Sequence, residues 1–117
     1  LNKSKKEKDM PHIRIRGIER AKVKELTIGL SEELGTIAEC PADWFTFEHI
    51  ETSFFYDGKD DEGLVFIEVL WFDRDSEARD KIAALFTEKG KKITDKIVTI
   101  VFIPLKENMY YEDGVHF

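Results

Sequence analysis

The stretch LVFIEVLWFDRDSEARDKIA, residues 64–83, decides the fold of this chain. Its opening part, Leu64 to Phe72, is almost entirely apolar, which is typical of a short strand that is buried on both faces. The polar run Asp75-Ser76-Glu77 then provides a signal for a helix N-terminus. The sequence therefore predicts a buried strand that passes directly into a helix.

The downstream sequence completes a strand–helix–strand unit. Apolar residues continue at helical spacing after residue 77, which predicts an amphipathic helix. The run IVTIVFIPL at 97–105 is again apolar throughout and predicts another strand. The apolar positions that define this helix are Ala78, Ile82, Leu85, Phe86 and Ile93.

The upstream sequence predicts a second unit of the same kind. Residues 12–18, HIRIRGI, alternate between apolar and polar side chains and predict a strand. From Glu19 to Glu39, apolar residues recur every three or four positions, which predicts one amphipathic helix that ends at Cys40-Pro41. An aromatic and β-branched run over 44–56 predicts the next strand. We expect the polar residues 57–63 to form a loop and the residues from 106 onward to be irregular.

The predicted order is β-α-β-β-α-β, and its two halves resemble each other weakly. Ile13 and Ile15 match Ile67 and Val69 at one constant spacing, and the run Tyr56-Asp57-Gly58 has an echo near the C-terminus. Two α/β (α+β) folds fit this order. In one, two βαβ units form a four-stranded mixed sheet about a pseudo-two-fold axis. In the other, the ferredoxin-like fold, strand 64–72 lies between strands 12–18 and 45–55.

Either fold places its helices on one face of the sheet and leaves the other face uncovered. Strands 64–72 and 97–105 carry apolar residues at both parities, so this second face is also largely apolar. An exposed apolar surface of that size favours association. We therefore expect a homo-oligomer.

Composition narrows the class of protein. The chain has 117 residues, a formal net charge of −6 and 42% hydrophobic residues, which suits one domain with a real core. The acidic balance argues against a general nucleic-acid binder, and no apolar run reaches the roughly 18–20 residues of a membrane helix. The one cysteine, Cys40, allows no disulfide framework and has no activating neighbour in the sequence. We expect a cytoplasmic protein without membrane contact.

The first residues, LNKSKKEKD (1–9), carry one apolar residue and no periodicity. We expect them to be a disordered leader or a start-site remnant, and residues 10–117 to form a single domain. The three histidines, His12, His49 and His116, lack the spacing of metal ligands, so each is interpreted as a surface or packing residue. We expect neither a metal nor another cofactor.

Pro11 is the first candidate for chemistry. If translation begins at Met10, removal of the methionine leaves Pro11 with a free secondary amine. An ordinary α-amino group titrates near about 7.7–8.0, and burial or nearby arginine charge lowers the pKa of such an amine. A base of this kind suits proton abstraction next to a carbonyl group. The alternative interpretation is that Pro11 only begins a strand, where its missing N–H does no harm.

Four arginines are further candidates. Arg14 and Arg16 share one face of the first strand, and Arg14 is the repeat counterpart of Glu68. This predicts either a cross-strand ion pair or a bidentate clamp on a substrate carboxylate. Arg20 and Arg74 each lie where a strand passes into a helix, a place that favours anions.

Three segments together resemble a known family: MPHIRIRGIE (10–19), FIEVLWFDRDSEARDKIA (66–83) and YYEDGVHF (110–117). They are similar to a family of small uncharacterised bacterial proteins grouped with the tautomerase, or macrophage migration inhibitory factor-like, superfamily. The resemblance implies a tautomerase-like fold, a homotrimer, and an N-terminal proline as the acid/base residue.

The resemblance also implies roles for particular residues. Pro11 falls on the catalytic proline of tautomerases, and Arg74 falls on a substrate-binding arginine at the start of a helix. Arg20 is the corresponding residue of the first half. A second carboxylate-binding arginine of 4-oxalocrotonate tautomerases aligns near Thr46-Phe47, where this sequence has none.

Two classes of function follow from these observations. One is a keto–enol tautomerase or isomerase of small 2-oxo acids, in which Pro11 is the general base and Arg14, Arg20 and Arg74 bind the substrate carboxylate. The other is a non-catalytic oligomer of the same fold. It is either a module that binds a small molecule or a protein, or a purely structural or regulatory trimer.

Overall fold

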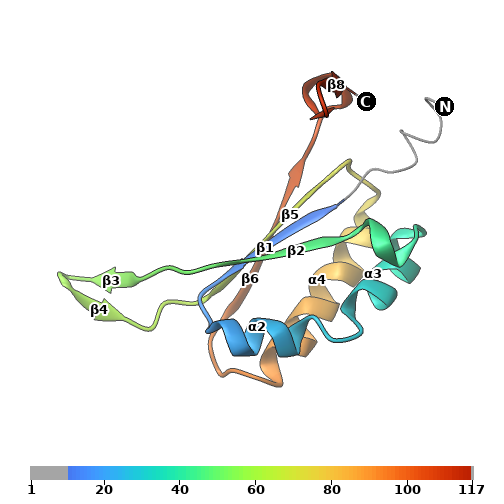
Figure 1. Ribbon diagram of the computed structural model, residues 1–117. Coiled ribbons are helices and arrows are strands. Elements are labelled where there is room, and N and C mark those ends of the chain that lie inside the picture. Colours follow the sequence, from blue (N-terminus) through green and yellow to red (C-terminus); the bar gives the residue numbers. More distant parts are fainter. Residues whose placement is uncertain (1–10, 117) are drawn as a thin grey trace.

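A four-stranded mixed sheet forms the centre of the computed structural model, which describes residues 11–116 (Figure 1). The strand order is β2-β1-β5-β6. β1 pairs with β2 in parallel, β5 pairs with β6 in parallel, and β1 and β5 are antiparallel. The strands are β1 (His12–Arg16), β2 (Thr46–Ile50), β5 (Val65–Trp71) and β6 (Val98–Pro104).

This order decides between the two predicted folds. Because β1 pairs directly with β2, each βαβ unit keeps its two strands adjacent, and the tautomerase-like arrangement is confirmed. The ferredoxin-like alternative is wrong, since it would place β5 between β1 and β2. Arg14 pairs with Glu68 at the centre of the β1–β5 register. These two residues are counterparts in the predicted repeat. The two halves are therefore related by a pseudo-two-fold axis at this pair.

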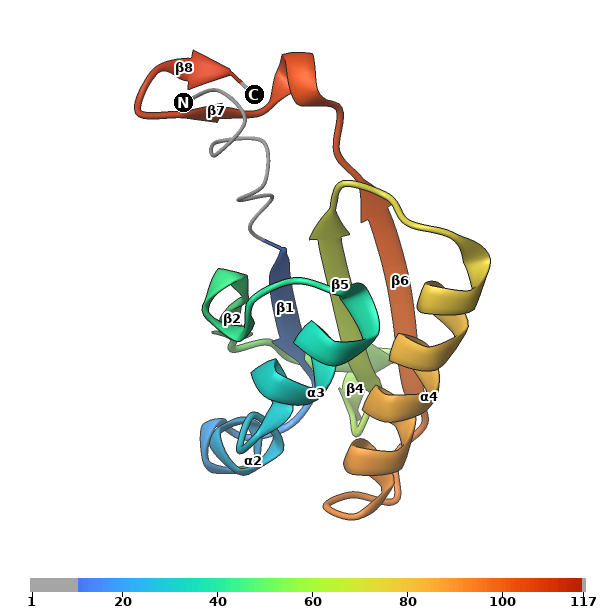
Figure 2. The same ribbon diagram turned by 90° about the vertical axis from the view of Figure 1, so that its right-hand side faces the viewer.

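The helices α2 (Arg20–Leu26), α3 (Leu30–Ala38) and α4 (Ser76–Lys91) cover one face of the sheet (Figure 2). The start of α4 follows the sequence signal, because the Asp75 side chain accepts a hydrogen bond of 2.9 Å from the N–H of Ala78. The single helix predicted over 19–39 is wrong, since the chain breaks into α2 and α3. Gly29 adopts φ of 70° at the break, and the Thr27 hydroxyl donates to the carbonyl of Lys24.

The core lies between the helices and the sheet. Residues of β1 and β5 alternate between buried and partly exposed, so only one face of each strand is fully covered. Phe66 and Leu70 therefore stay partly exposed, and the expectation that strand 64–72 is buried on both faces is not met within one chain. Fully covered core side chains include Ile13, Ile15, Ile67, Trp71, Leu30, Leu34, Ile82 and Phe86.

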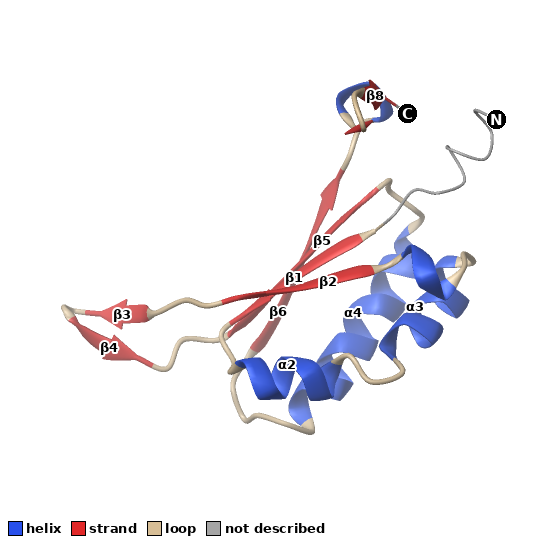
Figure 3. Ribbon diagram, in the orientation of Figure 1, coloured by secondary structure: helices blue, strands red, loops and turns tan. Residues whose placement is uncertain are grey.

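Two small hairpins project from the sheet (Figures 1 and 3). The first joins β3 (Phe54–Tyr56) to β4 (Lys59–Asp61), and the second joins β7 (Tyr111–Glu112) to β8 (Val115–His116). Each turns on an Asp-Gly pair with positive φ, at Asp57-Gly58 and at Asp113-Gly114. The predictions of one strand over 44–56, a loop over 57–63 and an irregular tail are therefore wrong.

Both halves of the chain thus end in the same kind of turn, which strengthens the weak sequence repeat. Two short 3-10 helices, Ala42–Trp44 and Glu107–Met109, complete the described elements. None of the helices within residues 11–116 has the length and apolar character to span a bilayer. The predicted leader, residues 1–9, lies outside the described residues.

Candidate active site

Pro11 lies at the start of β1 and its side chain is fully buried. Its carbonyl oxygen accepts a hydrogen bond of 3.0 Å from the N–H of Thr46, which ties it to the start of β2. The β1–β5 register pairs His12 with Leu70. Continued by one residue, this register places Pro11 opposite Trp71, at the C-terminal end of β5.

Arg74 lies at this same end of the sheet. Its guanidinium is 5.1 Å from the centre of the buried Trp71 ring, within the range of a cation–π contact. Arg74 Nη1 donates to the carbonyl of Phe72 (2.9 Å), and Nε donates to the carbonyl of Ala38 (3.3 Å). The side chain therefore joins the C-terminal end of α3 to the end of β5, besides bringing a positive charge to the end of the sheet where Pro11 lies.

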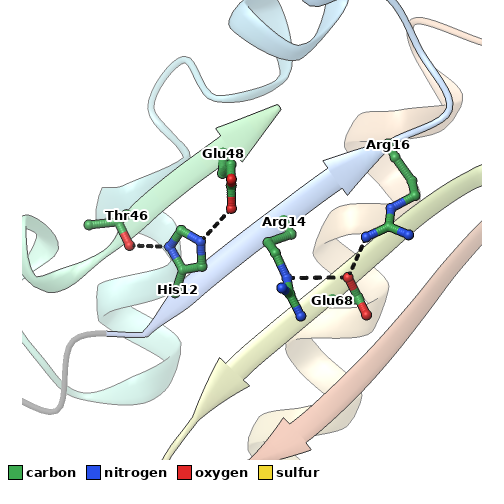
Figure 4. Close-up of polar contacts among 6 residues, drawn as sticks. All are labelled: His12, Arg14, Arg16, Thr46, Glu48 and Glu68. Atoms are coloured by element: carbon green, nitrogen blue, oxygen red, sulfur yellow. Dashed lines mark hydrogen bonds and ion pairs between the residues drawn. The ribbon is translucent and has the colours of Figure 1, made fainter. Parts of the chain in front are cut away.

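Arg14 and Arg16 lie on the open face of the sheet and share one carboxylate, that of Glu68 (Figure 4). Arg16 Nη2 donates to Glu68 Oε1 over 2.9 Å, whereas Arg14 Nε lies 3.3 Å from the same oxygen without hydrogen-bond alignment. Glu68 is 17% exposed and each arginine 33%. The predicted cross-strand ion pair is present, and the cluster keeps a surplus of one positive charge.

A second polar cluster on the open face joins β1 to β2 (Figure 4). His12 Nδ1 is 2.6 Å from Thr46 Oγ1, and His12 Nε2 is 2.8 Å from Glu48 Oε1. The sequence interpretation left His12 as a surface or packing residue and missed this cluster. The cluster could have been predicted from the alternation of polar residues in the two strands, because residues at alternate positions of a strand share one face of the sheet.

Arg20 lies at the opposite end of β1 from Pro11. It is the exposed first residue of α2, and β1 separates the two by about 17 Å, given the usual rise of about 3.3 Å per strand residue. It borders an open hollow of about 820 Å³ whose lining includes Gly17, His49 and Lys96. A single chain therefore brings Arg74 to the end of the sheet that holds Pro11, but not Arg20.

The remaining titratable candidates have local roles. A ring nitrogen of His49 lies 3.0 Å from the carbonyl oxygen of Ile18, and Cys40 is partly exposed. Within residues 11–116, no group of three or more His, Cys, Asp or Glu side chains is placed to hold a metal ion.

The strand order, the two βαβ units and the pseudo-two-fold axis define a tautomerase-like, macrophage migration inhibitory factor-like fold. A macrophage migration inhibitory factor-like protein from Entamoeba histolytica matches it with a TM-score of 0.73 at 15% identity, over 92% of this chain and 99% of that chain. The chain belongs to the DUF1904 family, a domain of unknown function whose model matches residues 10–116. No curated protein matches the chain.

Two solved structures are much more similar in sequence. A DUF1904 domain from Sebaldella termitidis ATCC 33386 is 80% identical, with a TM-score of 0.90 over 92% of this chain and 100% of that chain. A protein of unknown function from Vibrio cholerae O1 biovar eltor str. N16961 is 36% identical, with a TM-score of 0.82 over 95% of this chain and 90% of that chain.

Proposed function

We propose that this chain, in the form that begins at Pro11, is a keto–enol tautomerase of small 2-oxo acids. The observation that carries the proposal is the burial of Pro11 at the start of β1, opposite Trp71 and at the same end of the sheet as Arg74. A buried secondary amine near a fixed cation stays unprotonated more readily than an ordinary amine, so it can accept a proton from carbon.

The three arginines have different parts in this proposal. Arg74 is the carboxylate anchor within the same chain. Arg14 lies on the open face, where its charge is shared with Glu68, and serves as a second cation for the substrate. Arg20 can act on the same substrate only from another copy, because it lies at the far end of β1. We accordingly propose a homotrimer that acts in the cytoplasm.

Distant relatives support the class of chemistry. Pt0534, whose structure was solved inactivated by 2-oxo-3-pentynoate, matches with a TM-score of 0.70 at 18% identity. A fused 4-OT described as an asymmetric trimer matches with a TM-score of 0.75 at 13% identity. The DUF1904 model begins at residue 10, directly before Pro11, and the Sebaldella chain is matched over its whole length by 92% of this one. A chain of the family that matches 92% of this one therefore has the same fold.

One observation favours the non-catalytic alternative. Arg74 already donates to two main-chain carbonyls, which is what a purely structural arginine would do. In that case the protein is an oligomeric module that binds a small carboxylate or a protein partner without turnover.

The test compares the full chain with a form that begins at Pro11, using phenylpyruvate and a panel of other 2-oxo acids. We expect turnover only in the Pro11-first form, because an amide nitrogen has no basic lone pair. Pro11→Ala should weaken turnover without abolishing it, since a primary amine remains. Pro41→Ala, which alters an exposed proline, is the matched control. Equal turnover by both forms, or none by either, would contradict the proposal.

A further inference from the structure

The cluster of His12, Thr46 and Glu48 has an arrangement suited to proton transfer. A hydroxyl group contacts one nitrogen of the imidazole ring and a carboxylate contacts the other, at 2.6 Å and 2.8 Å. An imidazole held in this way by a carboxylate on its far side is the arrangement that fixes a histidine for acid–base work. The main chains of β1 and β2 also pair directly, in parallel, at these residues.

The chemistry of the partners determines which ring nitrogen carries a proton. The Glu48 carboxylate can only accept, so Nε2 of His12 carries a hydrogen in every state that keeps this contact. Thr46 can either donate or accept, so its hydroxyl fits both forms of Nδ1. When the ring is imidazolium, Nδ1 donates; after it loses that proton, the Thr46 hydroxyl can donate to Nδ1 instead. Nδ1 is therefore the position at which a proton can leave and return.

The cluster lies next to the proposed reacting group. His12 directly follows Pro11, and the N–H of Thr46 holds the Pro11 carbonyl while its hydroxyl contacts His12. Pro11, His12 and Thr46 thus form one connected group at the start of two parallel strands. Within one chain, the His12 side chain is 37% exposed.

We infer that His12 is the general acid of the proposed tautomerase, with Glu48 as a positioning residue and the Thr46 hydroxyl as the group that relays the proton. Enolisation of a 2-oxo acid needs two groups: a base that removes the proton from carbon and an acid that protonates the carbonyl oxygen. Pro11 takes the carbon proton on its amine. The His12 imidazolium gives its Nδ1 proton to the Thr46 hydroxyl, which passes its own proton to the carbonyl oxygen as the carbon–carbon double bond forms. Solvent then carries the proton from the Pro11 ammonium group to His12, so both groups return to their starting protonation states. The inference rests on the proposed function.

The charged groups that face His12 fit this assignment. Glu48 on β2 contacts the ring at Nε2, and the cation next along β1 on the same face, Arg14, is paired with Glu68. From β5, the side chain opposite His12 is the apolar Leu70. The carboxylate of Glu48 is therefore the charge in direct contact with the ring.

The test uses His12→Gln in the Pro11-first form. Glutamine can keep both hydrogen bonds, as donor to Glu48 and acceptor from Thr46, but cannot transfer a proton. We expect kcat to fall by about 100-fold or more, KM to stay within about twofold, and the alkaline limb of the kcat–pH profile to disappear. Glu48→Gln should also lower kcat, with KM unchanged, because an amide in contact with Nε2 no longer determines which ring nitrogen carries the hydrogen. His49→Gln, which changes a histidine near the far end of β2, should leave the profile unchanged.

The outcomes separate the two proposals. Wild-type kcat and an unchanged pH profile in His12→Gln would overturn the role of His12 while tautomerase activity stands. An absence of turnover in the Pro11-first form with His12 intact would overturn the proposed function, and the role of His12 with it.

Discussion

At the scale of single residues, Arg20 and Arg74 show how a tertiary contact separates two similar arginines. Arg20 begins the helix after β1, and Arg74 precedes the helix after β5. The two arginines occupy corresponding positions in the sequence repeat. In the structure, Arg74 lies over Trp71 and donates to two carbonyls. The Arg20 side chain is exposed and makes no hydrogen bond or ion pair within residues 11–116. Position in a repeat therefore does not decide the role of an arginine.

The first prediction compares these two residues. Arg74→Ala should lower the free energy of unfolding by about 1–3 kcal/mol, because two charge-assisted hydrogen bonds and a cation–π contact are lost. Arg20→Ala should change it by less than about 0.5 kcal/mol, as is usual for an exposed side chain. Urea unfolding of the two variants measures the difference, and equal effects would contradict the structural role of Arg74.

The second prediction concerns the carboxylate shared on the open face. Glu68→Gln leaves Arg14 and Arg16 without a counter-charge, so the two guanidinium groups repel each other. We expect a loss of roughly 1–2 kcal/mol, reduced because the arginines are one-third exposed to solvent. The loss should shrink in high salt, which screens the repulsion. Unfolding at two salt concentrations tests this, and a loss independent of salt would point to packing instead.

At the scale of elements, two glycines mark where the backbone leaves its regular path. Gly17 ends β1 with φ of 104°, and a Cβ atom there would lie 1.9 Å from the carbonyl oxygen of Leu64. Gly29 separates α2 from α3 with φ of 70°, and a Cβ atom there would meet nothing within 4 Å. At Gly17, a side chain would both clash with Leu64 and require a positive φ. At Gly29, only the positive φ favours glycine.

The third prediction uses this contrast. Gly29→Ala should cost about 1 kcal/mol, the strain of a left-handed backbone without glycine. Gly17→Ala should cost at least about 2 kcal/mol more, because the start of β5 must move to make room. Thermal unfolding of both variants gives the comparison. A similar loss in both would show that β1 and β5 approach less closely than described.

At the scale of the whole molecule, the sheet is covered on one face only. The open face carries apolar side chains of β5 and β6, among them Phe66, Leu70 and Val101, beside the polar clusters of β1 and β2. The hairpins extend from this sheet and carry exposed aromatic residues, including Phe55 and Tyr111. The molecule measures 51 × 28 × 26 Å, so it is drawn out along one direction. The open face and the hairpins together expose more apolar surface than is usual for a stable monomer.

The fourth prediction follows from the uncovered face. The protein should have a mass of about 41 kDa in light scattering, three times that of the 13.6 kDa chain, with the open faces inward. Leu70→Glu should dissociate the assembly, since a carboxylate would be buried among apolar side chains. Arg20→Ala serves as a surface control and should keep the trimer. A monomer at micromolar concentration would contradict this assembly.

Much of the architecture could be predicted from the sequence by itself. Alternation in residues 12–18, the apolar runs of the later strands and the helix signal at Asp75 determined the order of elements, because burial imposes a period on each element. The cross-strand partner of Arg14 followed from the repeat. The break at Gly29 and the two hairpins were missed, since a periodic apolar stripe reports which face is buried and not whether the backbone is continuous.

What the tertiary structure decided is the pairing of elements and therefore the composition of the candidate site. Only the register of β1 with β2 and β5 brings Thr46 and Glu48 to His12, places Trp71 opposite Pro11, and leaves Arg20 at the far end. These contacts join residues more than thirty positions apart. Local sequence patterns cannot predict which of these distant residues meet. The free energy that selects a strand register comes from the whole packed sheet and its helices.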